Sequence, residues 1–106
     1  MTKSKEKEIQ KITERIKEKY KPEKIILFGS FAHGKPTKDS DVDLFIIKKT
    51  KETRTKRHLK VDRMLLDRAI PLDVLVYTPQ EIKERLSLGD FFIKNIIQRG
   101  KILYAK

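Results

Sequence analysis

The sequence predicts an α/β fold, in which a small mixed β-sheet of three to four strands carries helices packed on it. Two observations lead to this prediction. Apolar residues gather in short runs of strand length, and amphipathic stretches at helical spacing separate these runs. The 106 residues suffice for one modest core, so we expect a single domain over residues 1–106.

The predicted elements follow one another in the order α-β-α-β-α-β-α-α. They are helix 4–20, strand 23–28, one helical turn at 30–34, strand 41–47, a helix at about 54–69, strand 71–77, helices 79–88 and 91–99, and a terminal strand or tail at 101–106.

In the first half of the chain, apolar residues at helical spacing among Lys and Glu predict the first helix, and Pro22 ends it. Strand 23–28 is a short apolar run that stops at a glycine. Ser30 can cap the turn that follows, and Gly34 can close it. Strand 41–47 is apolar after its first residues, as expected for a strand that is covered on both faces.

In the second half, the helix at 54–69 is predicted from apolar residues that we expect to point inward. These are Leu59, Leu65, Leu66 and Ala69. Thr78, Pro79 and Glu81 form the pattern of a capping box at the start of the next helix. Asp90 can cap the last helix, and a glycine can end it.

Three aspartates stand at the starts of predicted strands. Side chains alternate along a strand, so Asp41 and Asp43 share one face, with Cβ atoms roughly 7 Å apart. That span can hold one or two Mg²⁺ ions, which take oxygen ligands and keep room for water and phosphate. An isolated Asp-x-Asp pair is also a common solvated strand end. Asp73 opens the next predicted strand in the same way, although it also fits a turn residue after Pro71. Three such carboxylates can converge on one metal site.

Gly29 and Ser30 lie at a strand-to-helix turn. Glycine permits close approach of the backbone there, and free N–H groups at a helix start bind anions. The hydroxyl of Ser30 adds a donor for a phosphate, although an ordinary capped turn has the same residues. Beside three carboxylates in one small sheet, this turn favours Mg²⁺-assisted phosphoryl or nucleotidyl transfer.

The stretch GSFAHGKPTKDSDVDL resembles the G-S-x-A-x-G-x(5)-S-D-x-D-L signature of the minimal nucleotidyltransferases, a branch of the DNA polymerase β-like superfamily. The likeness runs over nearly the whole chain, since Asp73 and the ending FFIKNIIQRGKILY are also similar to that family. The group includes the antitoxins of HEPN-type toxin–antitoxin pairs and, more distantly, aminoglycoside nucleotidyltransferases.

The resemblance implies a role for each matching residue. Asp41, Asp43 and Asp73 would be the catalytic residues and would bind two Mg²⁺ ions, and Gly29 and Ser30 would hold the triphosphate of ATP. The implied reaction moves AMP from ATP onto a hydroxyl. By resemblance this hydroxyl belongs to a tyrosine of a partner HEPN toxin, which would make the chain an antitoxin in a hetero-oligomer.

His33 departs from the family pattern, because many relatives have arginine at this position. A neutral imidazole lacks the permanent charge and the forked hydrogen bonds of a guanidinium, so it cannot replace a phosphate contact of that kind.

The small size of the chain also favours a partner. A small sheet builds one wall of a cleft, and we expect another subunit or the acceptor to supply the second wall.

The composition limits the other possible functions. The formal net charge is +11, and residues 48–60 form a basic segment that attracts polyanions. No motif that reads nucleic acid accompanies this segment, so nucleic acid is the less favoured partner. The absence of cysteine excludes disulfides and thiolate metal sites. The apolar runs are too short for a membrane span, and the N-terminus lacks the apolar region of a signal peptide, so we expect a cytoplasmic protein.

Two alternatives to this enzyme remain open. The basic segment 48–60 would also suit a non-catalytic module that neutralises a partner, or grips nucleic acid, by binding alone. A small-molecule acceptor such as an aminoglycoside is a weaker alternative, because the substrate-recognition domains of those enzymes are missing. The apolar stripe at 91–97 is expected to be core, with a protein-docking face as the alternative.

Overall fold

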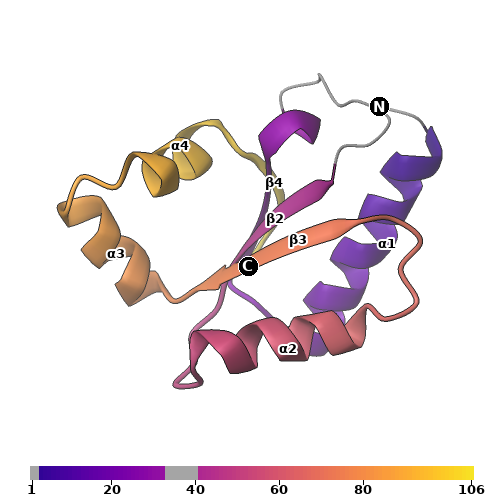
Figure 1. Cartoon of the computed structure of the whole chain (residues 1–106), viewed down its shortest axis with the longest axis horizontal. Coiled ribbons are helices and arrows are strands. Elements are labelled where there is room, and N and C mark those ends of the chain that lie inside the picture. The colour runs from indigo at the N-terminus through magenta and orange to yellow at the C-terminus, as the bar shows by residue number, and fades with distance from the viewer. Residues whose placement is uncertain (1–2, 33–40) are drawn as a thin grey trace.

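The computed structural model describes residues 3–32 and 41–106 of the chain. Within these residues a four-stranded mixed sheet, in the order β3-β2-β1-β4, carries helices on both faces (Figure 1). The elements are α1 (Lys3–Tyr20), β1 (Lys24–Phe28), the 3-10 turn η1 (Gly29–Phe31), β2 (Val42–Ile47), α2 (Arg54–Met64), β3 (Leu72–Tyr77), α3 (Pro79–Ser87), α4 (Phe91–Arg99) and β4 (Lys101–Ala105). The predicted α/β class and element order are confirmed, and the last segment is a strand.

The directions of the strands decide which ends meet. β1 runs antiparallel to both β2 and β4, whereas β2 and β3 are parallel and are joined through α2. The carboxyl end of β1 and the amino ends of β2 and β3 therefore lie at one edge of the sheet. The residues that the sequence singled out for chemistry occur at these three strand ends.

Each face of the sheet has its own core. α1 and α2 pack on one face, where Ile16, Leu44 and Val61 are fully buried. α3 and α4 pack on the other face, against Phe45 and its neighbours. Both Leu44 and Phe45, which are consecutive residues of β2, have 0% exposure. The prediction that this strand is covered on both faces is therefore confirmed. None of the described helices is long and apolar enough to cross a lipid bilayer.

The prediction for the helix at 54–69 was wrong in its length and in its inward face. The helix ends at Met64, and of the four residues expected inside only Leu65 is buried. The exposed ones are Leu59, Leu66 and Ala69. Arg57 takes the inward position instead and donates to the carbonyl of Val76 at 3.3 Å. Because β3 is an edge strand, its outward carbonyls need donors, and a charged side chain meets this need where leucine cannot.

The predicted helix caps of the second half are confirmed. The Thr78 hydroxyl accepts from the Glu81 N–H at 3.1 Å, and the Glu81 carboxylate accepts from the Thr78 N–H at 2.8 Å. These two bonds form a capping box at the start of α3. The Asp90 carboxylate accepts from the Ile93 N–H at 3.1 Å and so caps α4. These caps fix where α3 and α4 begin.

Candidate functional site

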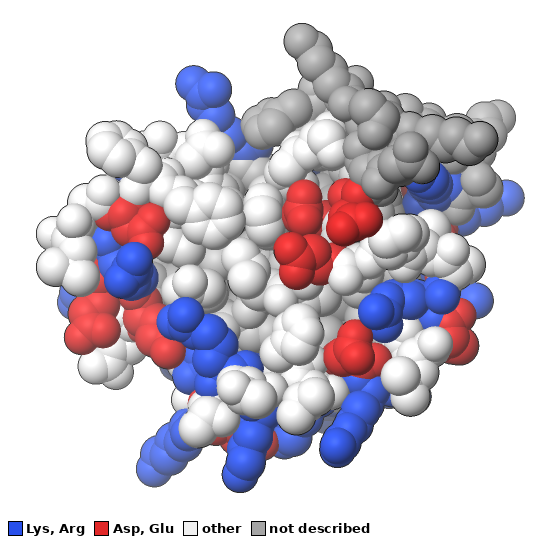
Figure 2. All heavy atoms as spheres, viewed as in Figure 1, with Lys and Arg blue, Asp and Glu red and all other residues white. Residues whose placement is uncertain are grey.

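The structure brings two of the predicted acidic residues side by side. Asp43 on β2 pairs in register with Asp73 on β3, and Asp43 also pairs with Phe28 on β1. Asp41 immediately precedes β2, and its side chain is exposed. The three carboxylates therefore stand at one edge of the sheet, on the strand ends that the topology brings together. On the face of the molecule that Figure 2 shows, acidic atoms gather near the middle, whereas most basic atoms lie nearer the rim.

The charges at this edge repel one another. Burial, together with the nearby charges of Asp73 and Asp41, raises the pKa of the Asp43 carboxyl above its ordinary value. The Asp43 side chain is half-buried, so solvent screens the repulsion only in part. A cation placed among the three carboxylates would relieve this cost.

No basic side chain of the described residues forms an ion pair with any of these three aspartates. The other described aspartates all have such a partner. Their pairs are Asp62 with Arg68, Asp67 with Arg15, and Asp90 with Arg85. The chain has 26 Lys and Arg residues, so a lack of basic residues is not the cause. Among the described residues, this group of acids therefore has no cation from the chain itself.

Gly29 packs directly against the acidic edge. Its φ of +75° lies in the left-handed region that favours glycine, and a Cβ there would collide with the carboxylate of Asp43, whose Cγ would be 3.2 Å away. The left-handed backbone turns the chain into η1, in which the Ala32 N–H donates to the Gly29 carbonyl at 3.1 Å. Only a glycine therefore allows the turn to lie this close to the Asp43 carboxylate.

Ser30 lies inside the turn, and the prediction that it caps the turn was wrong. The N-cap is Phe28, which makes no side-chain capping bond. The Ser30 side chain is half-buried and has no hydrogen bond to any described residue. No described residue therefore occupies the Ser30 hydroxyl, which leaves it able to bind a ligand. Gly34 and His33, which the sequence also singled out, lie outside the described residues.

The three carboxylates have the chemistry of a site for a hard divalent cation. Mg²⁺ prefers carboxylate oxygens and keeps further positions for water and phosphate oxygens. In residues 3–32 and 41–106, no three acidic or imidazole side chains already converge as a preformed metal-binding group. The raised pKa of Asp43, and the absence of basic partners within the described part of the chain, nevertheless fit a cation, because a bound cation would neutralise the repelling carboxylates.

Two cations of the basic segment 48–60 form hydrogen bonds within the protein. The Lys48 ammonium donates to the carbonyl of Tyr20 at 2.7 Å, and Arg57 donates to the carboxylate of Glu81 at 2.6 Å. These two cations therefore stabilise the fold. They hold α1 and α3 in place, at the opposite end of β2 and β3 from the aspartates.

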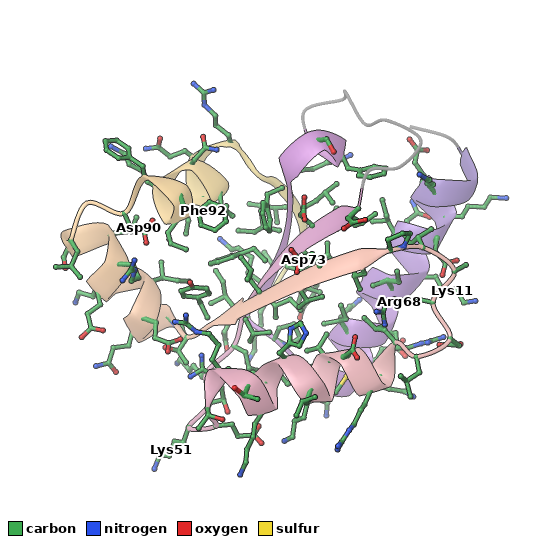
Figure 3. All side chains as sticks on the ribbon, in the orientation of Figure 1. Lys11, Lys51, Arg68, Asp73, Asp90 and Phe92 are labelled. Carbon is green, nitrogen blue, oxygen red and sulfur yellow. The ribbon has the colours of Figure 1, made fainter. Side chains whose placement is uncertain are left out.

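The apolar stripe of α4 divides between core and surface. Ile93 and Ile96 are buried, as the preferred prediction expected, whereas Phe91, Phe92 and Ile97 are exposed. The Phe92 ring contacts the ring of Phe28 edge-on, next to the acidic edge. The sequence analysis missed this aromatic border. Its one available signal was that an aromatic residue directly precedes the Gly-Ser turn. Asp73 on β3 and Phe92 on α4 can be followed in Figure 3.

Comparisons with known proteins agree with this geometry. The family described as "Polymerase beta, Nucleotidyltransferase" matches residues 10–106. A protein of Methanocaldococcus jannaschii, provisionally named a protein adenylyltransferase, is 28% identical over 104 residues, which cover 93% of this chain and 97% of that protein. A crystal structure of a provisionally assigned nucleotidyltransferase from Sulfolobus solfataricus has the same fold. Its TM-score is 0.66 at 20% identity, over 94% of this chain and 79% of that chain. The chain therefore belongs to the polymerase β nucleotidyltransferase family.

Proposed function

We propose that this chain transfers a nucleoside monophosphate, AMP from ATP, onto a hydroxyl group in a reaction that needs divalent cations. The observation that carries the proposal is the register pair Asp43–Asp73, which stands beside Gly29 without a basic partner among the described residues. The family supplies the reaction class, and the relative named as a protein adenylyltransferase supports AMP as the transferred group.

In this reaction the hydroxyl oxygen forms a bond to the α-phosphorus of ATP, and the bond from that phosphorus to the pyrophosphate oxygen breaks. Asp41, Asp43 and Asp73 would hold two Mg²⁺ ions, which when bound supply charge neutralisation for the attacking and leaving oxygens. The N–H groups of η1 and the Ser30 hydroxyl would bind the phosphates of the leaving pyrophosphate. Asp73, the exposed acid on the edge strand, can accept the proton that the hydroxyl releases.

We propose further that the acceptor is a protein, and specifically a tyrosine of a HEPN-type toxin, so that this chain acts as an antitoxin. Asp41 and Asp73 are exposed, which leaves room for a hydroxyl that belongs to a large partner. The relative named as a protein adenylyltransferase and the resemblance to the minimal nucleotidyltransferases support the same class of acceptor.

The test is incubation of the purified chain with α-labelled ATP, Mg²⁺ and a HEPN-type protein that binds it. We expect label on a tyrosine of the partner, and none when EDTA replaces Mg²⁺. If no label is transferred while the two proteins demonstrably form a complex, the proposal is wrong.

The competing function is a non-catalytic protein that neutralises its partner by binding alone. Exposed apolar side chains such as Phe91 and Leu88 favour the binding of a partner. The double variant Asp41→Asn with Asp43→Asn separates the two functions. Under our proposal it still binds the partner but neither labels nor neutralises it. Full neutralisation by the double variant would show that binding alone suffices.

A further inference from the structure

An aromatic ring with a free surface borders the acidic edge. Phe92 lies in the first turn of α4, and 53% of its surface is exposed. Its ring meets the ring of Phe28 nearly at a right angle, with the two centroids 5.9 Å apart. Phe28 is the last residue of β1 and directly precedes Gly29. The ring of Phe92 is therefore held next to the turn at Gly29 by an aromatic contact.

Two other aromatic rings on this side of the sheet, those of Phe45 on β2 and Tyr77 on β3, are packed against neighbouring side chains. Phe45 has 0% exposure, and its ring stacks on Tyr77 with centroids 5.2 Å apart. The guanidinium of Arg54 lies over the Tyr77 ring, 4.6 Å from its centroid. Within the described residues, Phe92 is thus the ring that both contacts the site strand β1 and keeps half of its surface open.

The register of the sheet places Phe28, the residue that Phe92 contacts, in line with two of the carboxylates. Phe28, Asp43 and Asp73 form one row across three adjacent strands. Neighbouring strands lie about 4.8 Å apart, so two strand spacings separate Phe28 from Asp73. A nucleotide with its α-phosphate at the carboxylates and its β- and γ-phosphates at the turn after Phe28 can reach Phe92 with its base.

We propose that Phe92 is the stacking surface for the base of the nucleotide donor. The inference rests on the proposed nucleotidyl transfer. The acceptor attacks opposite the leaving pyrophosphate. Because the pyrophosphate is assigned to the turn at the end of β1, the acceptor enters on the β3 side, away from Phe92. The exposed ring therefore serves the donor and not the acceptor. A purine offers a larger face than a pyrimidine, so ATP and GTP bind more tightly than CTP and UTP.

The chain has no tryptophan, which gives a direct test of this contact. The variant Phe92→Trp places a single indole at the proposed stacking position. We expect ATP with Mg²⁺ to quench its fluorescence strongly, CTP to quench it less, and inorganic tripolyphosphate to leave it unchanged. Phe91→Trp is the matched control, since the neighbouring side chain is 81% exposed and has no aromatic contact to a described residue. We expect little quenching there.

A binding measurement on Phe92→Ala completes the test. Loss of the stacking contact should weaken the binding of ATP by about 5- to 150-fold and should leave the affinity for tripolyphosphate unchanged. If the unaltered protein binds ATP and neither variant responds as described, the stacking role is wrong while the proposed function stands. If the unaltered protein binds neither ATP nor tripolyphosphate, the proposed function itself fails. Loss of partner binding with intact ATP binding in Phe92→Ala would assign this ring to a docking face and overturn the inference.

Discussion

Two carboxylates at opposite ends of the β2–β3 pair, Asp43 and Glu81, have opposite surroundings. Glu81 accepts from Arg57 at 2.6 Å and from the Thr78 N–H at 2.8 Å. Burial alone would raise the pKa of Glu81, but the hydrogen bonds and the charge of Arg57 outweigh it and lower that pKa. Burial and the charges of two neighbouring acids raise the pKa of Asp43. Asp43 also has no basic partner among the described residues.

The comparison separates a structural acid from a candidate catalytic one. The Arg57–Glu81 pair joins α2 to α3 and, through the carbonyl of Val76, to β3. It therefore holds the fold together with a cation that the chain itself supplies. The acids at the other end of β2 and β3 have no basic partner among the described residues, and we propose that a cation from solution neutralises them. Exceptions to the local rules of a fold are expected at functional sites, and here three like charges lie together without an ion-pair partner among the described residues.

The largest effect is expected from Asp43→Asn. The variant keeps the size of the side chain but removes a proposed metal ligand, so transfer activity should fall at least about 1000-fold, since metal ions supply several kcal/mol of transition-state stabilisation. Its Tm should rise by a few degrees, because a repelled carboxylate is gone. Excess Mg²⁺ should raise the Tm of the unaltered protein but not that of the variant.

The matched control for this prediction is Asp62→Asn. Asp62 pairs with Arg68 at 3.2 Å near the surface, so its loss should leave the activity unchanged. A variant Asp43→Asn that is both active and destabilised would reverse the comparison, because Asp43 would then act as a structural acid.

The second largest effect is expected from Arg57→Met at the structural end. The Arg57 side chain is only 7% exposed, and its removal leaves the Glu81 carboxylate without its cation. Breaking a buried pair in this way should lower the free energy of unfolding by about 3 kcal/mol. Urea unfolding measures the loss, and the activity per folded molecule should be preserved.

Arg85→Met is the control for the buried pair. The Arg85 side chain is 51% exposed in its pair with Asp90, so its loss should cost less than about 1 kcal/mol. Equal losses in the two variants would show that the Arg57 network is no more important to the fold than a surface pair.

A smaller effect is expected from Gly29→Ala, which tests the contact between the turn and the acids. The left-handed backbone should cost about 1–2 kcal/mol for any residue with a Cβ. The new methyl group would also displace the Asp43 carboxylate, so activity should fall sharply. Gly89→Ala is the matched control, since its φ is +79° but nothing lies within 4 Å of the added Cβ. We expect a similar loss of stability there and full activity, and an inactive Gly89→Ala would remove the argument for a local contact at Gly29.

The smallest effect concerns pH. The raised pKa of Asp43 means that the folded protein holds this proton at pH values where the unfolded chain, with a pKa near 3.8, has lost it. The contribution of Asp43 to stability therefore falls as the pH rises through its folded-state pKa. Glu81 has the opposite sign, because its pKa is lowered and its contribution is lost as the pH falls through that pKa.

Thermal unfolding at a series of pH values checks this difference in sign. The Tm advantage of Asp43→Asn over the unaltered protein should be full at neutral pH and should vanish below about pH 3.8, where Asp43 is protonated in both states. A Tm difference that stays constant from neutral to strongly acid pH would mean that the charge of Asp43 does not cause it.

The sequence by itself determined most of the local structure and the residues worth testing. The helical spacing of apolar residues, the capping box at Thr78 and the glycine at 29 each act over a few neighbouring residues, so a local pattern predicts them. The Asp-x-Asp pair at the start of β2 and Asp73 at the start of β3 were visible for the same reason.

Only the tertiary structure decided how these parts meet. The register that sets Asp43 beside Asp73 depends on the parallel crossover through α2, and the contact of Phe92 with Phe28 depends on where α4 packs. The inward position of Arg57 depends on the free edge of β3, which a pattern confined to one helix does not reveal. Local periodicity shows which face of a strand each residue occupies, but the strand that it pairs with and the residue that lies beside it depend on contacts between residues far apart in the chain.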